Sequence, residues 1–553
     1  MTRYIPLLIL PLFFLACARQ TSPTGGPKDT IPPVLIRELS TPRHESINFK
    51  GNKITLQFDE DVAVNNPKEQ IIIIPDIGKD YEISARKQTV TINLKSKLLD
   101  STTYSLNFRE AIQDITEKNT PENLKLAFST GHYIDSLSIS GKATSAQKKE
   151  DLKEITVAIY QSDTFNILKH KPIYITKSDK TGNFSLENLK PGNYFLYAFE
   201  DKNRNLIVDT KNEMYAFLSD TIKLITPIKK IDLELFKLDL RPLKLTSARP
   251  YNTYFNIKTG KNLVSYKLKS VQAPIISSFG EDQSNIKIYN TFNQDSLLVS
   301  FNATDSANNT IDTTLYIKFS QRDVRPEAFT HQSLGSRVIS EKGILKSRIK
   351  FSKPLLSITF DSIYYAIDST TNIPITKEDV KWDSIHNILS IEKKFDKNLL
   401  KEPEEIKTSD AEKNTAPKPI YQFVLRKGSF ISIESDSSNL IQETVKPLTL
   451  ESTGIIIVQV DIKVPNFIIQ LRDKSFNILE TKVNTRKVEF EDLVPGDYLI
   501  SVVIDSDSNG EWSLGNLLLN QEPEKIIYYK NEKKNSLINL KANFELGPLL
   551  ITD

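Results

Sequence analysis

The chain contains few of the residue types on which most enzyme sites depend. Its 553 residues include one cysteine, two methionines, five histidines and 18 glycines. A single cysteine excludes an internal disulfide, so the fold is stabilised by packing alone. The scarcity of glycine argues against a glycine-rich phosphate-binding fold. No two histidines have the spacing of metal ligands; they are His44, His132, His170, His331 and His386.

Sequence motifs of catalysis are also missing. The chain has no Gly-x-Ser-x-Gly, no Walker-type loop and no dinucleotide fingerprint. Paired carboxylates, such as those of residues 59–61 and 402–405, are more typical of a solvated surface than of glycosidase acids. We therefore expect that the protein is not an enzyme. The alternative is a site formed by carboxylates that are distant in the sequence and meet in the fold.

Charge gives no indication of a nucleic-acid partner. The 72 Lys and Arg residues nearly balance the 69 Asp and Glu residues, and they are dispersed along the chain. Hydrophobic residues make up 39% of the chain and charged residues 25%, as in soluble globular proteins. The length is too great for one core, so we expect several domains.

The amino terminus predicts export and lipidation. Arg3 precedes an apolar stretch, residues 5–14, which is too short to span a bilayer comfortably and suits a signal peptide. Ala16 and Cys17 follow, in a pattern that resembles a bacterial lipoprotein signal, although Phe14 and Leu15 depart from its usual residues. We expect a signal peptide over 1–16, acylation of Cys17, attachment to a membrane by lipid and a flexible tether over 17–30. An ordinary signal peptide with a chance cysteine is the alternative.

Alternating apolar and polar residues predict an all-β protein. Residues 54–58, 90–94, 104–108 and 124–128 all alternate with period two, and turn-forming residues separate them. Short strands at such intervals, with few helical stretches, are typical of β-sandwiches. The segment 31–131 has the length of one such domain.

This first domain resembles the bacterial Ig-like domain first described in S-layer proteins. The likeness lies in "IPPVLIRELSTP", "KITLQFDEDV", "LLDSTTYSLNFREAIQDITEKN" and the closing "LKLAFSTG". Lys118 stands where this family usually has glycine. The resemblance implies an Ig-like β-sandwich.

A second pattern occurs twice. "LKPGNYFLYAFEDKNRNLIVD" begins at Leu189, and "LVPGDYLISVVIDSDSNGEW" begins at Leu493. The segments that carry them, 134–240 and 447–553, resemble the prealbumin-like sandwich of carboxypeptidase regulatory domains. Between them we expect two Ig-like sandwiches, 241–323 and 324–446. Residues 401–419 have almost no apolar side chains, which predicts a disordered loop inside the latter.

The acidic loops after the two repeats predict calcium sites. Calcium prefers several oxygen ligands on alternating residues of a tight loop. The loops offer Asp201, Asn203, Asn205 and Asp209 in the first copy, and Asp505, Asp507 and Asn509 in the second. Leu206 replaces the usual turn glycine, Glu213 follows one residue late, and Asn516 stands where a glutamate ligand is usual. Polar β-turns without metal are the alternative.

The whole chain resembles lipoproteins of Bacteroidota in which an Ig-like domain follows a "GGPKD" tether. That likeness implies an outer-membrane location, on either its periplasmic or its outer face. We expect a binding or scaffold subunit that docks on an outer-membrane protein complex through loops and strand edges. A surface adhesin or glycan-binding protein is the alternative, because aromatic clusters such as "YNTYF" (251–255) can form a sugar platform; such clusters are more often core.

Overall fold

Nearly all the regular secondary structure of the described residues is β-strand. The structure, a computed structural model, describes residues 29–552 apart from 79, 123, 162–164, 293, 323–326 and 401–418. In that part of the chain the only α-helix is α1 (Pro67–Gln70). None of its helices is long and apolar enough to cross a bilayer. The predicted signal peptide, Cys17, the tether up to residue 28 and nearly all of the predicted loop 401–419 lie outside the described residues.

The first sandwich is built from antiparallel strands around one core. The first of its sheets has the order β1 (Lys53–Gln57), β5 (Thr89–Leu94), β4 (Tyr81–Arg86). The second has the order β3 (Ile72–Ile74), β6 (Thr103–Asn107), β8 (Lys125–Ser129), and a third pairs β2 (Val62–Val64) with β7 (Ile112–Asp114). The period-two residues of these strands point into the core, as their alternation predicts.

Four consecutive isoleucines connect the first sandwich to the next. Ile71 and Ile73 belong to the core of the first sandwich, whereas Ile72 and Ile74 belong to the core of the second. Successive side chains of a strand point to opposite faces, so β3 contributes one face to each core. The run is therefore buried, and it belongs to the cores of two modules at once.

The second sandwich contains one repeat. Its larger sheet has the order β11 (Tyr174–Lys177), β10 (Thr156–Tyr160), β13 (Gly192–Phe199), β14 (Tyr215–Phe217), and β15 (Ile222–Leu224) also pairs with β13. The other sheet has the order β12 (Asn183–Leu189), β9 (Leu137–Ser145), β16 (Ile228–Leu235). The pairing of β9 with β16 is parallel, and the other pairings are antiparallel.

The C-terminal sandwich repeats that topology strand for strand. Its larger sheet has the order β37 (Ile478–Val483), β36 (Phe467–Asp473), β39 (Gly496–Ile504), β40 (Ile526–Tyr528), and β41 (Ile538–Leu540) also pairs with β39. Its smaller sheet has the order β38 (Lys487–Leu493), β35 (Gly454–Asp461), β42 (Glu545–Thr552). The repeated Pro-Gly-x-Tyr has a clear role: Tyr194 and Tyr498 are buried and donate to the carbonyls of Lys190 and Val494, at 2.9 and 2.7 Å. Each tyrosine thereby fixes the turn that begins the central strand.

Two more sandwiches lie between the repeats. The third has sheets β17 (Leu245–Pro250), β18 (Tyr254–Thr259), β21 (Asn285–Tyr289), β20 (Ser277–Phe279) and β19 (Leu263–Lys269), β22 (Leu297–Asp305), β23 (Thr310–Ile317). The larger sheet of the fourth sandwich has the order β29 (Val380–Asp383), β30 (Ile388–Lys394), β25 (Ile344–Phe351), β24 (His331–Ile339), β34 (Pro447–Leu448). Its second sheet has the order β28 (Asn372–Pro374), β27 (Ile363–Ala366), β31 (Gln422–Leu425), β33 (Ile441–Thr444). A third sheet pairs β26 (Leu355–Ile358) with β32 (Phe430–Ser432). Each surrounds its own core.

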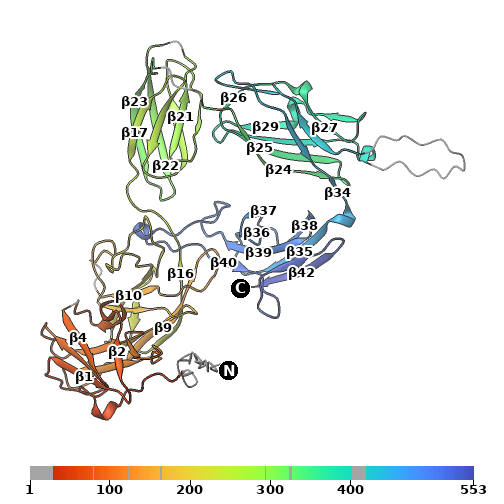
Figure 1. The fold of residues 1–553 in the computed structure, drawn as a ribbon. Coiled ribbons are helices and arrows are strands. Elements are labelled where there is room, and N and C mark those ends of the chain that lie inside the picture. The colour runs from red at the N-terminus through yellow and green to blue at the C-terminus, as the bar shows by residue number, and fades with distance from the viewer. Residues whose placement is uncertain are drawn as a thin grey trace, which may run out of the picture.

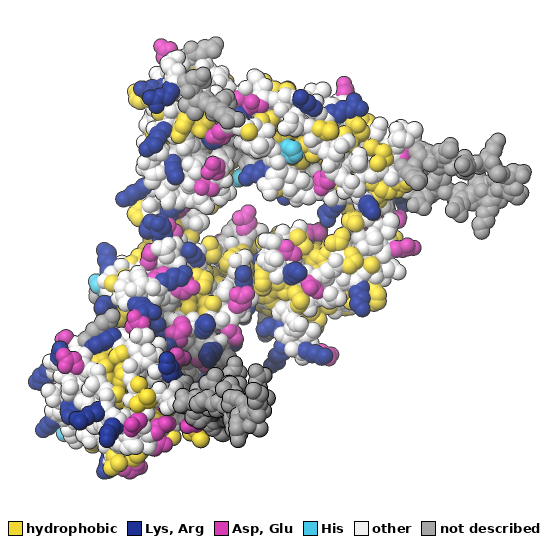
Figure 2. Space-filling view, viewed as in Figure 1, with side chains coloured by type: hydrophobic (Ala, Val, Ile, Leu, Met, Phe, Trp, Pro, Cys, Tyr) yellow, Lys and Arg dark blue, Asp and Glu magenta, His cyan; other side chains and the backbone are white. Residues whose placement is uncertain are grey.

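The chain returns on itself. The third and fourth sandwiches lie above the second and C-terminal ones in Figure 1, and the C-terminal sandwich contacts the second. The Tyr528 hydroxyl donates to the Gln147 carbonyl at 2.6 Å, and the Ser219 N–H donates to the Glu522 carboxylate at 2.7 Å. Figure 2 shows an opening between the two tiers. Modules two to five therefore form a closed circuit rather than an extended string.

Candidate site at the two acidic loops

The two acidic loops occupy equivalent places in the second and C-terminal sandwiches. The first, residues 201–213, connects β13 to β14, and the second, residues 505–524, connects β39 to β40. In both sandwiches these strands are antiparallel neighbours. The duplicated topology therefore places Asp201 and Asp505 at the same end of equivalent sheets.

The leading aspartate organises each loop. Asp505 accepts hydrogen bonds from the backbone N–H groups of Asn509 and Gly510, at 3.0 and 3.1 Å. Asp201 accepts from the corresponding N–H groups of Asn205 and Leu206, at 3.0 and 3.3 Å. Leu206 has a φ of 62° and Gly510 a φ of 78°. Leu206 thus adopts the left-handed conformation that the sequence pattern assigns to glycine, at a cost on the order of 1 kcal/mol.

A buried glutamate closes each loop. Glu524 accepts from the N–H groups of Ser506 and Ser513, at 2.6 and 2.9 Å. Glu213 accepts from Lys202 and Asp209, at 2.9 and 2.7 Å. The donors are the second and ninth residues of the loop in both copies, so the two glutamates are structural equivalents.

Sequence reasoning missed Glu524 because it expected the closing residue at the twelfth position. Asn516, which stands there, instead accepts from the Leu518 N–H and caps a short 3-10 turn, η6 (Leu517–Leu519). A sequence signal did exist: Glu213 and Glu524 each precede the next strand of the sheet by two residues. The distance from the loop's first residue varies, whereas the distance to the strand does not.

The second loop gathers more negative charge than the first. Ligand atoms of Asp505, Asp507 and Glu524 all lie within 4.8 Å of one another. Asn203 replaces Asp507 in the first loop, so an amide stands where the second loop has a carboxylate. Asp209 accepts from the Lys211 N–H at 3.1 Å and from the Asn212 side-chain amide at 2.7 Å. The predicted residues therefore cluster in both loops, but the carboxylates converge in the second.

Burial and hydrogen bonds shift the pKa of these carboxyls in opposite directions. Burial raises the pKa of Glu213, against the opposing effect of the N–H groups of Asp209 and Lys202. The hydrogen bond from the Ser513 hydroxyl, 2.6 Å long, lowers the pKa of Asp507. Asp507 is therefore charged at neutral pH and available to a cation.

The second loop fits a hard cation such as Ca²⁺. Each oxygen of Asp505 accepts one backbone hydrogen bond and keeps a lone pair, since a carboxylate oxygen has two. Glu524 Oε1 accepts from both the N–H and the hydroxyl of Ser506 and braces the loop, whereas its Oε2 accepts from the Ser513 N–H and keeps a lone pair. The structure thus adds Glu524 to the ligands predicted from the sequence, Asp505, Asp507 and Asn509, and calcium binding stays a prediction.

The longer second loop also makes the contact that closes the circuit. Compared with the first loop it has an insertion that contains η6. Leu514 and Leu517 of this insertion and the preceding Trp512 pack against the buried cluster on the outer side of the larger sheet of the second sandwich. A Cβ on Gly515 would come within 2.8 Å of the Phe236 ring, so the approach requires glycine. We call residues 512–522 the docking segment.

The aromatic clusters do not form a common platform. Tyr251 and Tyr254 stack with ring centroids 4.7 Å apart, and the Tyr254 hydroxyl donates to Glu327 at 2.9 Å. Tyr365 and Tyr528 are buried. Tyr365 belongs to the core of the fourth sandwich, and Tyr528 lies at the contact between the C-terminal and second sandwiches.

Comparison with known proteins identifies the first module. Residues 29–130 match the family of bacterial Ig-like domains. The predicted resemblance of the first sandwich to this family is thereby confirmed. The Ig-like match covers less than a fifth of the chain, so it describes that module alone. No curated protein matches this chain.

Several solved structures are similar at low level. The Bacillus anthracis TIE protein is 10% identical over 96% of this chain and 76% of its own, with a TM-score of 0.13. The major pilin subunit BcpA of Bacillus cereus is 11% identical over 75% and 98%, with a TM-score of 0.14. Domains 1–6 of the surface layer protein SbsC are 12% identical over 93% and 68%, with a TM-score of 0.14. These TM-scores are too low to bear on function.

Proposed function

We propose that this protein is a lipid-anchored, non-catalytic scaffold of the bacterial outer membrane, which docks as an accessory subunit on a membrane protein complex. The single cysteine at the end of a lipoprotein-like signal supports the anchor, and the Ig-like first module supports a binding role. The lipid fixes where the protein acts, and its exposed loops and strand edges recognise the partner.

The closed arrangement of the modules is the observation that carries this proposal. A scaffold must hold its surfaces at fixed relative positions, and tandem domains joined only by linkers do not. Here the docking segment fixes the C-terminal sandwich on the second one. The third and fourth are also joined: the Phe279 N–H donates to the Ile385 carbonyl at 2.8 Å, and the side-chain amide of buried Asn387 donates to the Ser278 hydroxyl at 3.0 Å.

Two experiments test this function. An affinity-tagged copy, expressed in its native host and extracted in mild detergent, is expected to co-purify an integral membrane protein at fixed stoichiometry. Labelled fatty acid is expected on the wild-type chain and not on a Cys17→Ser variant. A chain that carries no lipid refutes the anchor. A chain that purifies alone and binds glycans on an array supports the adhesin alternative instead.

A further inference from the structure

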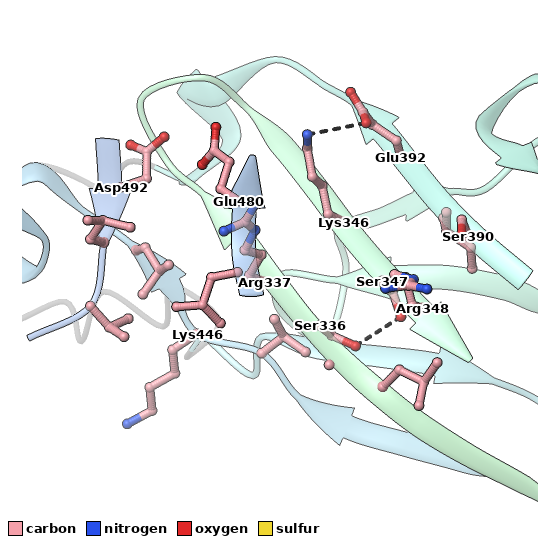
Figure 3. A pocket seen from close by; sticks show the side chains of 18 of the residues that line it. Ser336, Arg337, Lys346, Ser347, Arg348, Ser390, Glu392, Lys446, Glu480 and Asp492 are labelled. Atoms are coloured by element: carbon pink, nitrogen blue, oxygen red, sulfur yellow. Dashed lines mark hydrogen bonds and ion pairs between the residues drawn. The ribbon is translucent and has the colours of Figure 1, made fainter. Parts of the chain in front are cut away.

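A cleft of about 1340 Å³ separates the fourth sandwich from the C-terminal one. One wall is the outer face of the sheet β29-β30-β25-β24, and the opposite wall is formed by strand β37 and the end of β38. Figure 3 shows side chains of both walls. The volume exceeds the roughly 300–1,000 Å³ of pockets that enclose small molecules, so the cleft suits a segment of a polymer.

The first wall is basic. Strand pairing places Arg337 of β24 opposite Lys346 of β25. Two residues further along β25, Arg348 lies opposite Ser390 of β30, and Ser390 lies opposite Lys381 of β29. Their neighbours along β25, Leu345 and Ile349, are buried, so Lys346 and Arg348 point away from the core. Lys346 pairs with Glu392 at 3.3 Å, the contact drawn in Figure 3.

Four other cations of this wall have no ion pair within the described part of the chain. They are Arg337, Arg348, Lys381 and Lys394, which come from four adjacent strands and are exposed. An array of unpaired cations on one sheet face creates a positive potential inside a walled cleft. The lining also contains five carboxylates, and four of them already pair with a lysine: Asp379, Glu392, Glu480 and Asp492. The charge left unpaired in the cleft is therefore mainly positive and favours an anionic occupant.

The second wall offers an open strand edge. Among the described strands β37 pairs only with β36, so its other edge carries unpaired backbone N–H and C=O groups. Ile478 and Leu479 on this strand are 51% and 52% exposed. Proteins normally protect such edges, and an open edge with exposed apolar side chains beside a cleft is suited to strand addition.

A bridge between the two sandwiches holds the cleft at one end. Lys342, in the turn between β24 and β25, pairs with Glu491 at 2.8 Å and with Asp492 at 2.5 Å. Its pKa is raised by these hydrogen bonds, which keeps the lysine charged. The bridge therefore links the two walls at this end of the cleft.

We propose that this cleft binds an extended acidic segment of a partner protein, which adds to β37 as a further strand. The proposal rests on the binding function proposed above and names the chemistry of the partner. Backbone hydrogen bonds to β37 supply affinity, and carboxylates of the segment pair with Arg337, Arg348 and Lys381. Single-stranded nucleic acid is disfavoured, because it requires stacking aromatics and the aromatic residue of the lining is the buried Tyr498.

The test measures fluorescence anisotropy of a labelled decapeptide of alternating Glu and Val with the full mature chain. Binding is expected to weaken roughly tenfold or more in the triple variant Arg337→Glu/Arg348→Glu/Lys381→Glu, because charge reversal opposes the acidic peptide. Leu479→Asp is expected to weaken it too. A peptide with alternate N-methylated amides is expected to bind poorly, since it has lost the N–H groups of one edge.

The matched control reverses three exposed cations elsewhere, Lys223, Lys229 and Lys267, and is expected to bind like wild type. Equal binding of the N-methylated peptide, or equal loss in both triple variants, overturns the proposal. Absence of peptide binding overturns it as well, and dextran sulfate binding that is lost only in the first triple variant reassigns the cleft to an acidic polysaccharide. A first triple variant that loses the peptide but still co-purifies its membrane partner leaves the proposed function intact and separates it from this cleft.

Discussion

The indole N–H of Trp512 donates a hydrogen bond of 2.9 Å to the main-chain carbonyl of Glu524. The Trp512 ring packs against apolar clusters of both the C-terminal and the second sandwich. The Glu524 side chain braces the second acidic loop through Ser506 and Ser513. The hydrogen bond between Trp512 and Glu524 therefore connects the acidic loop to the contact between the C-terminal and second sandwiches.

Replacing Trp512 is expected to open the circuit. Trp512→Ala removes a partly buried ring shared by two modules, which costs about 2–3 kcal/mol at this contact, somewhat less than the loss at a fully buried site. Small-angle X-ray scattering is expected to show a larger radius of gyration than wild type, while circular dichroism shows unchanged strand content.

Neighbouring leucines on η6 provide the control. Leu517 packs against the second sandwich, whereas Leu518 is 62% exposed. Leu517→Ala is expected to act in the same direction as Trp512→Ala, and Leu518→Ala to leave the scattering unchanged. Equal effects of the two leucine variants contradict a specific docking contact.

Calcium is expected to bind the second loop more tightly than the first. Three carboxylates converge there, whereas the first loop has an amide at Asn203. Extracellular calcium modules have dissociation constants on the order of 10⁻⁴–10⁻³ M. Calorimetric titration of the mature chain is expected to show binding in that range, and Asp507→Asn to weaken it roughly tenfold.

Asp473, an aspartate in a turn outside the acidic cluster of the second loop, serves as the control for calcium. Asp473 accepts from the N–H groups of Ser475 and Asn477, at 2.8 and 2.9 Å, as the leading loop aspartates do with theirs. Asp473→Asn is expected to leave the titration unchanged. A wild-type chain that gives no heat with calcium refutes the site and leaves both loops as polar turns.

The connection between the third and fourth sandwiches is expected to weaken in acid. Glu327 forms an ion pair with Lys287 and accepts from the Tyr254 hydroxyl. Burial raises the pKa of Glu327, but these partners outweigh it and hold the pKa below its ordinary value. Because the folded-state pKa is depressed, the stabilisation is present above the unfolded pKa of about 4.3 and is lost as the pH falls through the folded value.

Glu327→Gln tests this dependence. The side chain is 48% exposed, so the stabilisation is expected to be at most about 1 kcal/mol at pH 7. Chemical unfolding at pH 3–7 is expected to show a difference between wild type and variant that disappears toward pH 3. Glu281→Gln, at an exposed position of the same sandwich, is expected to show no pH-dependent difference. A difference that grows toward acid contradicts the assigned sign.

The sequence was sufficient for those features that one segment determines locally. Alternating residues predicted the strands, and the repeated Pro-Gly-x-Tyr predicted equivalent turns, which the buried Tyr194 and Tyr498 form. The duplication extends further than the repeated motif, because all eight strands of each copy follow the same order. The Ig-like identity of the first module was also predictable from its motifs.

Features that join distant segments were not predictable. Glu524 was not predicted as the closing residue of the second loop, because an insertion changes its distance from Asp505 in the sequence. The docking segment has no period-two pattern that would identify it as a strand. The role of its apolar residues Leu514 and Leu517 is visible only in the structure, where they pack against the second sandwich. The cleft likewise combines cations of one module with an edge strand of another, and a single sequence gives no relative placement of the two.

The last prediction concerns Arg472, a buried arginine that has no acidic partner among the residues the structure describes. Arg472 is 1% exposed and donates to three neutral acceptors, the Ser501 hydroxyl, the Phe476 carbonyl and the Gln470 side chain, and burial lowers its pKa. Arg472→Met removes the buried charge, fills similar space and leaves Ser501 bonded to Gln470, so its stability is expected to lie within about 1 kcal/mol of wild type or above it. Arg472→Ala leaves a cavity and is expected to cost about 2–4 kcal/mol in urea unfolding. Equal losses in both variants show that the guanidinium hydrogen bonds, and not its packing volume, stabilise this site.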